Sequence, residues 1–213
     1  MTVNEGLQPA RPTLSENMRV RFKGVLDPIA RVLLGLGLMP NTITLTGLVG
    51  NAIGALFLAR SNFLVGGLLV LLMGPIDALD GAMARLRGEG SDFGAFVDSV
   101  TDRYSELFIY GGLLVTFVAT QQTALIVLTF FAAAGSVLVS YVKARAESLA
   151  FEAKGGLLTR FERYLILAPA LVLTGFGVSQ AAWIGIALIA VLANVTALQR
   201  IRAVRQQARH RGA

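Results

Sequence analysis

The sequence predicts an all-α integral membrane protein with six transmembrane helices and an N-terminal amphipathic helix at the membrane interface. Of its 213 residues, 54% are hydrophobic, and the mean hydropathy is +0.65. Apolar runs of about 20 residues, long enough to cross a bilayer, recur along the chain. The connections between these runs are short, so neighbouring helices are expected to be antiparallel. The absence of cysteine excludes a disulfide framework and a thiolate metal site.

The first predicted element is an interfacial helix over residues 14–38, which follows a flexible segment, 1–13. Apolar residues recur in this segment at spacings of three or four and form a stripe on one helix face, and the basic residues lie on the other faces. That pattern is typical of a helix lying on a membrane. A disordered basic tail is the alternative. Interruptions at Asp27, Pro28 and Arg31 exclude a cleavable signal, so we expect the N-terminus to be retained. The stripe comprises Met18, Phe22, Val25, Ile29, Val32 and Leu36.

Six spans are predicted at 42–59, 62–86, 93–119, 122–148, 159–176 and 180–203. They form one membrane domain, 39–205, followed by a basic C-terminal tail, 206–213. With six spans, both termini and the loops at 86–92 and 149–158 lie on the same side as nearly every basic residue, and only Arg60 lies clearly opposite. The positive-inside rule places that side in the cytoplasm of a multi-pass protein of the cell membrane. The high isoelectric point, about 10.3, is therefore no argument for nucleic-acid binding.

Four aspartates interrupt this apolar sequence: Asp77 and Asp80 near the end of the second span, and Asp98 and Asp102 near the start of the third. A carboxylate near the middle of a membrane helix costs about 2.5–3.5 kcal/mol, so four of them imply a compensating cation. At about 100° and 1.5 Å per residue, each pair lies on one helix face, and both pairs lie about 9–15 Å from the 86–92 loop. Such oxygen ligands favour Mg²⁺ or Mn²⁺, and their number is enough for two ions.

Small residues share these helix faces. Gly81, Ala84 and Gly94 would let a diphosphate approach the backbone, although close helix packing explains each of them equally well. Arg85 beside them could neutralise a phosphate or pair with an aspartate.

Together these residues form the pattern D-x2-D-G-x2-A-R-x8-G-x3-D-x3-D, from Asp77 to Asp102. This pattern resembles the signature of the CDP-alcohol phosphotransferases, and the resemblance extends over essentially the whole chain. It implies transfer of a phosphatidyl group from CDP-diacylglycerol to an alcohol with release of CMP, and it favours a homodimer. It also implies two Mg²⁺ or Mn²⁺ ions held by the four aspartates, with Asp102 as general base. The residues implied around the CDP-lipid are Asn41, Thr42, Ile43, Thr44, Gly81, Ala84, Arg85, Ser91 and Gly94.

A second basic cluster gathers near the cytoplasmic ends of the last three spans: Lys143, Arg145, Arg160, Arg163 and Arg200. Several cations around one cavity suggest an anionic acceptor, although basic residues at span ends also serve as simple anchors. The segments 140–147, 160–163 and 198–200 resemble the branch formed by actinobacterial phosphatidylinositol phosphate synthases. That resemblance implies L-myo-inositol 1-phosphate as acceptor, phosphatidylinositol phosphate as product, and Lys143, Arg163 and Arg200 as the residues that bind the acceptor phosphate.

Two alternatives stay open. The same basic pocket could serve glycerol 3-phosphate, and the product would then be phosphatidylglycerophosphate. A divalent-cation transporter could use the aspartates as a permeation path. Against the transporter, the carboxylates gather at one depth, and no polar series continues to the other side of the membrane.

Overall fold

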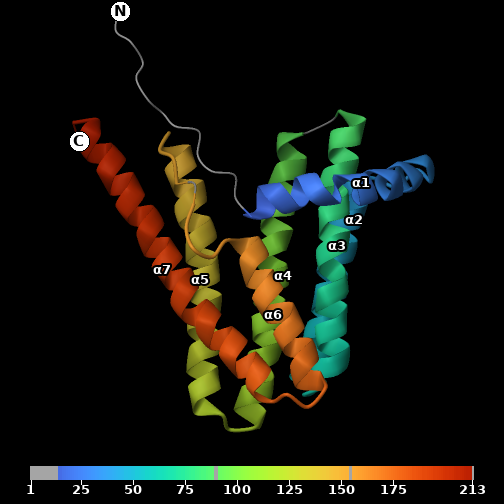
Figure 1. The fold of residues 1–213 in the computed structure, drawn as a ribbon, viewed down its shortest axis with the longest axis vertical. Helices are drawn as coiled ribbons and strands as arrows, with labels where there is room; N and C mark the ends of the chain where they lie inside the picture. Colours follow the sequence, from blue (N-terminus) through green and yellow to red (C-terminus); the bar gives the residue numbers. More distant parts are fainter. Residues whose placement is uncertain (1–13, 89–90, 154, 213) are drawn as a thin grey trace, which may run out of the picture.

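The computed structural model describes residues 14–88, 91–153 and 155–212, and within them every regular secondary-structure element is an α-helix, as predicted. The segment 1–13, predicted to be flexible, lies outside the described residues. Seven helices follow one another with short connections (Figure 1). Their bounds are α1 Leu14–Gly35, α2 Pro40–Ala59, α3 Phe63–Arg87, α4 Asp92–Ala119, α5 Thr123–Ser148, α6 Arg160–Gly175 and α7 Gln180–His210.

Local sequence explains where the helices that carry the charged residues begin and end. Asn62 caps α3 by accepting a hydrogen bond from the Val65 amide at 3.2 Å. Ser91 caps α4 in the same way, with its hydroxyl 3.0 Å from the Gly94 amide. Such caps satisfy amides that have no partner inside the helix. At its other end, α3 stops at Gly88, whose φ of 67° is left-handed and suits glycine.

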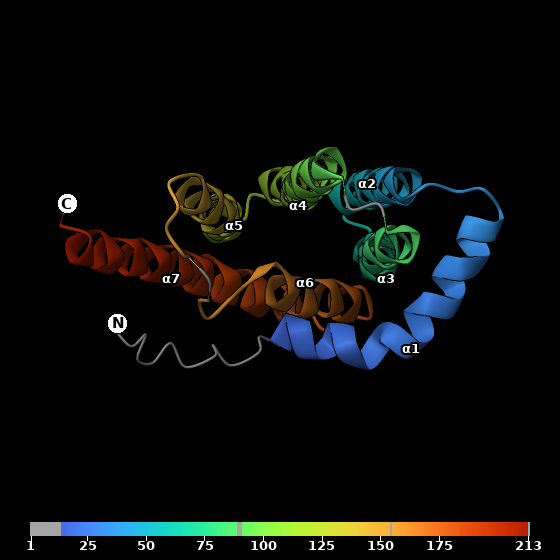
Figure 2. The same cartoon turned by 90° about the horizontal axis from the view of Figure 1, so that it is seen from above.

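Six helices form a closed ring, in which α2 contacts α3, α3 contacts α6, α6 contacts α7, α7 contacts α5, α5 contacts α4, and α4 contacts α2. Figure 2 shows this ring from above. The remaining helix, α1, packs on α3 and runs transverse to the bundle (Figures 1 and 2). The two aspartate-bearing helices, α3 and α4, each pack on α2, and in the described chain they are not among the pairs that pack closely on each other. The helices α3 and α4 are instead bridged by α2.

Four helices, α2, α3, α5 and α7, are long and apolar enough to cross a membrane by length and composition. The other two members of the ring fall outside that set for physical reasons. The helix α4 carries Asp98, Asp102, Arg103 and Glu106 in its first half, and α6 is 16 residues long. The structure is thus that of an all-helical protein with several candidate membrane spans.

Glycines allow the closest helix contacts. A Cβ at Gly112 in α4 would collide with the α2 backbone at Ala55, and one at Gly67 in α3 would meet the α6 backbone at Leu171 and Val172. These close approaches are typical of helix packing in membranes, where small residues let backbones meet. They fix α2 against α4 and α3 against α6, the two contacts that place the aspartates.

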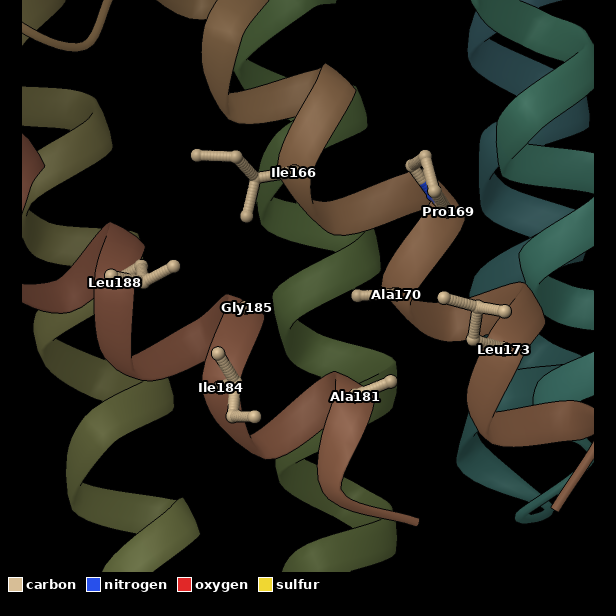
Figure 3. A pocket seen from close by; sticks show the side chains of 8 residues that line it. All are labelled: Ile166, Pro169, Ala170, Leu173, Ala181, Ile184, Gly185 and Leu188. Atoms are coloured by element: carbon tan, nitrogen blue, oxygen red, sulfur yellow. The ribbon is translucent and has the colours of Figure 1, made fainter. Parts of the chain in front are cut away.

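An open apolar hollow lies between α6 and α7 (Figure 3). Its described lining consists of apolar residues and glycine, and the lining residue nearest to the start of α6, Ile166, lies six residues beyond Arg160. It is therefore separate from the polar site described below. The lining residues are Ile166, Pro169, Ala170, Leu173, Ala181, Ile184, Gly185 and Leu188.

The last helix continues through His210, so most of the segment predicted as a basic tail, 206–213, is part of α7. Together with an earlier residue of α7, this extension holds the described parts of the α5–α6 connection, residues 149–153 and 155–159. Gln207 accepts a hydrogen bond from the Glu152 amide at 2.9 Å and donates one to its carbonyl at 2.6 Å. Arg211 donates to the carbonyl of Ala150, and Thr196 accepts from the Leu158 amide at 3.0 Å. The connection is thereby fixed along the second half of α7.

Candidate active site

Three of the four predicted aspartates come together inside the helix ring. One carboxylate oxygen from each of Asp77, Asp98 and Asp102 lies within 4.8 Å of the others. Asp80 is not a member of this group, and its Oδ2 accepts a hydrogen bond from the hydroxyl of Thr44 at 2.6 Å. Asp80 and Asp102 are both buried, with 6% and 7% of their surface exposed. Several carboxylates held this close repel one another unless a cation lies between them.

In this structure the guanidinium of Arg160 supplies positive charge to that group. Its Nη1 lies 2.6 Å from Oδ2 of Asp77, and its Nη2 lies 2.7 Å from Oδ1 of Asp102. Arg160 is the first residue of α6, so α6 connects the aspartate of α3 with that of α4. A second guanidinium, that of Arg103, lies 3.4 Å from the other oxygen of Asp102 and donates to Ser140 at 3.0 Å.

The carboxylate group fits a divalent cation. Oxygen ligands of this kind suit Mg²⁺ and Mn²⁺. Within the described residues, the buried Oδ1 of Asp102 receives no hydrogen bond of acceptable geometry, although Arg160 is close to it. An oxygen with an unused acceptor position, beside two further carboxylates, can coordinate a metal. Because Arg160 contacts two of the same carboxylates, a metal ion would compete with its guanidinium.

The residues predicted around the CDP-lipid lie on the neighbouring parts of α2, α3 and α4. Thr44 bonds Asp80 directly, and Ile43 is buried in a cluster with Ala82 and Met83 of α3. A Cβ at Gly94 would lie 3.0 Å from the Ser91 hydroxyl and 3.8 Å from Oδ1 of Asn41.

Four further members of this predicted set complete the region. Gly81 and Ala84 are half-buried, and Thr42 and Arg85 are exposed. A Cβ at Gly81 would lie 3.5 Å from Nη1 of Arg85. Gly81 therefore leaves room beside that guanidinium on the face that carries Asp77.

The three residues predicted to bind the acceptor phosphate have different surroundings. Arg163 is 2% exposed, and its Nη2 and Nε lie 2.7 Å and 3.0 Å from Oε1 of Glu106. Arg200 is also buried and donates to the carbonyls of Gly155 at 2.9 Å and Val139 at 2.6 Å. Lys143 is exposed, and its ammonium lies 3.8 Å from Oε1 of Glu147. Arg163 also contacts the Leu158 carbonyl at 3.5 Å, so both arginines hold the α5–α6 connection.

Comparison with known proteins agrees with this geometry. A family model described as CDP-alcohol phosphatidyltransferase matches residues 37–195. The chain belongs to the CDP-alcohol phosphatidyltransferase family. Among the curated relatives of this phosphatidyltransferase is the phosphatidylinositol phosphate synthase of Mycobacteroides abscessus, 40% identical over 191 residues, which are 88% of this chain and 86% of the relative. Its counterpart from Streptomyces avermitilis is 35% identical over 215 residues, covering 93% and 87%.

Solved structures of Mycobacterium tuberculosis phosphatidylinositol phosphate synthase resemble the fold of this phosphatidyltransferase. One, with CDP-diacylglycerol bound, is 34% identical with a TM-score of 0.79 and covers 84% of this chain and 93% of that one. Another, in complex with manganese and citrate, has the same identity and TM-score, with coverage of 84% and 88%. The membership identifies an enzyme of phosphatidyl transfer and favours that class over a cation transporter.

Two residues of this phosphatidyltransferase site, Arg160 and Glu106, make contacts that the sequence does not predict. The basic cluster interpreted as a sign of an anionic acceptor includes Arg160, yet in the structure this residue joins Asp77 to Asp102. Glu106 was not selected at all, yet it binds Arg163. A signal for Glu106 was present, because it continues the ridge of Gly94, Asp98 and Asp102 by another four residues. No comparable spacing in the sequence connects Arg160 with an aspartate 83 residues away.

Proposed function

We propose that this enzyme transfers the phosphatidyl group of CDP-diacylglycerol to inositol phosphate and forms phosphatidylinositol phosphate and CMP. The observation that carries the proposal is the convergence of Asp77, Asp98 and Asp102 to within 4.8 Å inside the ring, in a chain related to phosphatidylinositol phosphate synthases. A cluster of carboxylates of this kind can bind metal ions that in turn bind a diphosphate. The buried basic residues beside it can bind the phosphate of a phosphorylated acceptor.

The four aspartates would hold two Mg²⁺ or Mn²⁺ ions. Bound there, the ions would neutralise charge on the diphosphate during displacement of CMP. The carboxylate of Asp102 would accept the proton of the attacking hydroxyl, a role open to a carboxylate within hydrogen-bond reach. Arg160 would withdraw from Asp77 and Asp102 as the cations bind, because both kinds of cation use the same oxygens. The residues 41–44 with Gly81, Ala84, Arg85, Ser91 and Gly94 would surround the CDP part.

Lys143, Arg163 and Arg200 would bind the acceptor phosphate. Guanidinium groups form charge-assisted, often bidentate hydrogen bonds to phosphate. Support for this role comes from the burial of Arg163 and Arg200, which are held in place by Glu106 and by the α5–α6 connection. Lys143, exposed in the last two turns of α5, would add a flexible charge to this set.

The membrane arrangement follows from the same proposal. All six helices of the ring would cross the bilayer, with both termini and the site on the cytoplasmic side, and α1 would lie in the interface. Support for α1 comes from its surface: Ala30 is buried against α3, whereas Val25, Ile29 and Val32 remain exposed. An exposed apolar face of this kind suits lipid. By resemblance to its family, the enzyme would act as a homodimer.

An acceptor panel tests the proposal directly. Purified enzyme would receive CDP-diacylglycerol and Mg²⁺ with inositol phosphate, glycerol 3-phosphate or unphosphorylated inositol, and mass spectrometry would identify the lipid product. We expect phosphatidylinositol phosphate from the first acceptor alone, and no product after addition of a divalent chelator. Phosphatidylglycerophosphate as the main product would show that the acceptor is glycerol 3-phosphate instead of inositol phosphate, and the proposed phosphatidyl transfer would still hold. Full activity with the chelator present would contradict the metal mechanism.

A further inference from the structure

The helix that carries Asp77 and Asp80 contains a proline just before them. Pro75 has no backbone N–H, so the carbonyl of Leu71, four residues earlier, lacks the donor that a regular helix would supply. In a membrane-spanning helix no water replaces such a donor, and a carbonyl left without one destabilises the helix. The group that donates to this carbonyl therefore helps to determine the conformation of the α3 segment just before the aspartates.

That partner comes from α6. The hydroxyl of Tyr164 donates a hydrogen bond to the carbonyl of Leu71. Gly74 makes the approach possible, because a Cβ at this position would collide with the Tyr164 ring and hydroxyl. Proline, glycine and tyrosine thus form one contact, in which α6 supplies to α3 the donor that Pro75 removes.

The contact lies one helical turn from the aspartate group. Tyr164 follows Arg160 by four residues on α6 and therefore shares a face with it, and Arg160 binds Asp77 and Asp102. On α3, Asp77 follows Pro75 by two residues. We propose that Tyr164 is a positioning residue for the metal-binding aspartates, because its bond to the Leu71 carbonyl fixes the proline-containing turn of α3 that carries Asp77.

This inference rests on the proposed metal site, and Mn²⁺ binding tests it without turnover. Wild-type enzyme and variants in detergent would be titrated with MnCl₂, and electron paramagnetic resonance would measure the free ion. Tyr164→Phe removes only the hydroxyl, and Gly74→Ala disturbs the same contact from the α3 side. We expect both to weaken Mn²⁺ binding about two- to tenfold, the range that loss of one neutral hydrogen bond allows.

Matched controls separate positioning from general damage. Tyr110→Phe also removes a buried hydroxyl, whose partner is Ser136 at 3.2 Å, and Gly111→Ala adds a methyl group where no atom lies within 4 Å. Both should bind Mn²⁺ like the wild type. A purely structural role for Tyr164 would lower the melting temperature and leave Mn²⁺ affinity unchanged. Wild-type affinity in Tyr164→Phe, or equal weakening in Tyr110→Phe, would overturn the proposal.

A double mutant tests the role of the free carbonyl. Pro75→Ala restores an N–H that can donate to the Leu71 carbonyl within α3. The carbonyl then no longer depends on the Tyr164 hydroxyl for a donor. We expect Tyr164→Phe to cause no further loss of Mn²⁺ affinity in the Pro75→Ala background. The same loss in both backgrounds would refute the assigned mechanism. Asp77→Asn serves as the reference for the site: Mn²⁺ binding that survives this change unaltered would refute the proposed metal site itself, and with it the role of Tyr164.

Discussion

Replacement of Arg163 should destabilise the enzyme strongly, in addition to any effect on the acceptor. The guanidinium is 2% exposed and lies 2.7 Å from Oε1 of Glu106. Within the described residues, the buried Oε2 of Glu106 has no hydrogen-bond partner, so this carboxylate depends on Arg163. Removing one member of a buried ion pair costs about 3–5 kcal/mol because the other charge is left uncompensated. Arg163→Met should therefore lower the melting temperature by roughly 6–20 °C for a chain of this size.

Lys143→Gln is the matched comparison, because Lys143 belongs to the same predicted pocket but is exposed and lies 3.8 Å from Glu147. An exposed pair is worth about 0–1 kcal/mol, so this variant should melt within about 4 °C of the wild type. Both variants would be heated in the same detergent with detection by intrinsic fluorescence. The KM for inositol phosphate would be measured alongside.

A second substitution tests the physical cause. Glu106→Gln in the Arg163→Met background removes the stranded charge, so it should recover at least half of the lost stability. Any rise in the KM for the proposed acceptor, inositol phosphate, that Arg163→Met causes should persist in the double mutant, because Glu106→Gln does not restore the guanidinium. Equal melting temperatures for Arg163→Met and Lys143→Gln, or no recovery in the double mutant, would refute the argument from the buried pair.

Three further predictions concern the aspartates and the packing around them. Asp102→Asn should abolish CMP release while CDP-diacylglycerol still binds, because an amide cannot accept the hydroxyl proton; turnover near the wild-type rate would remove Asp102 from the base role. Arg160→Met should tighten Mn²⁺ binding about tenfold, because a competing cation leaves Asp77 and Asp102; weaker binding in a resonance titration would show that Arg160 supports the metal site instead. Gly112→Ala should cost about 1–3 kcal/mol of stability by forcing apart α4 and α2, whereas Gly111→Ala should melt like the wild type, and equal melting of the two would contradict the assigned close contact.

Hydropathy and spacing were enough to place the helices. The predicted spans agree with α2 to α6 within two residues at each end, because apolar runs stop where capping residues such as Asn62 and Ser91 stand. The last span is an exception, since α7 continues to His210. Hydropathy marks where a helix leaves the apolar region, whereas the helix itself continues as long as its backbone bonds and its contacts with the α5–α6 connection hold.

The site was less predictable than the helices. Helical periodicity placed Asp98 and Asp102 on one ridge, and the same ridge contains Glu106. Periodicity within a helix cannot, however, choose partners between helices. The choice of Arg160 as the neighbour of Asp77 depends on how α3 packs on α6, which is decided by close contacts such as that of Gly67 with the α6 backbone.

The contacts between Gln207 and Glu152 restrict how this enzyme can be shortened. Deletion of everything after residue 205 would leave all predicted membrane spans intact and would still remove Gln207 and Arg211, which hold the α5–α6 connection. That connection includes Gly155, whose carbonyl binds Arg200. The shortened protein would insert into the membrane with an intact aspartate group, but the α5–α6 connection beside Arg200 would be held less firmly. For protein production, deletions at the C-terminal end are therefore not neutral, and a purification tag requires a linker that leaves the last turn of α7 free to pack.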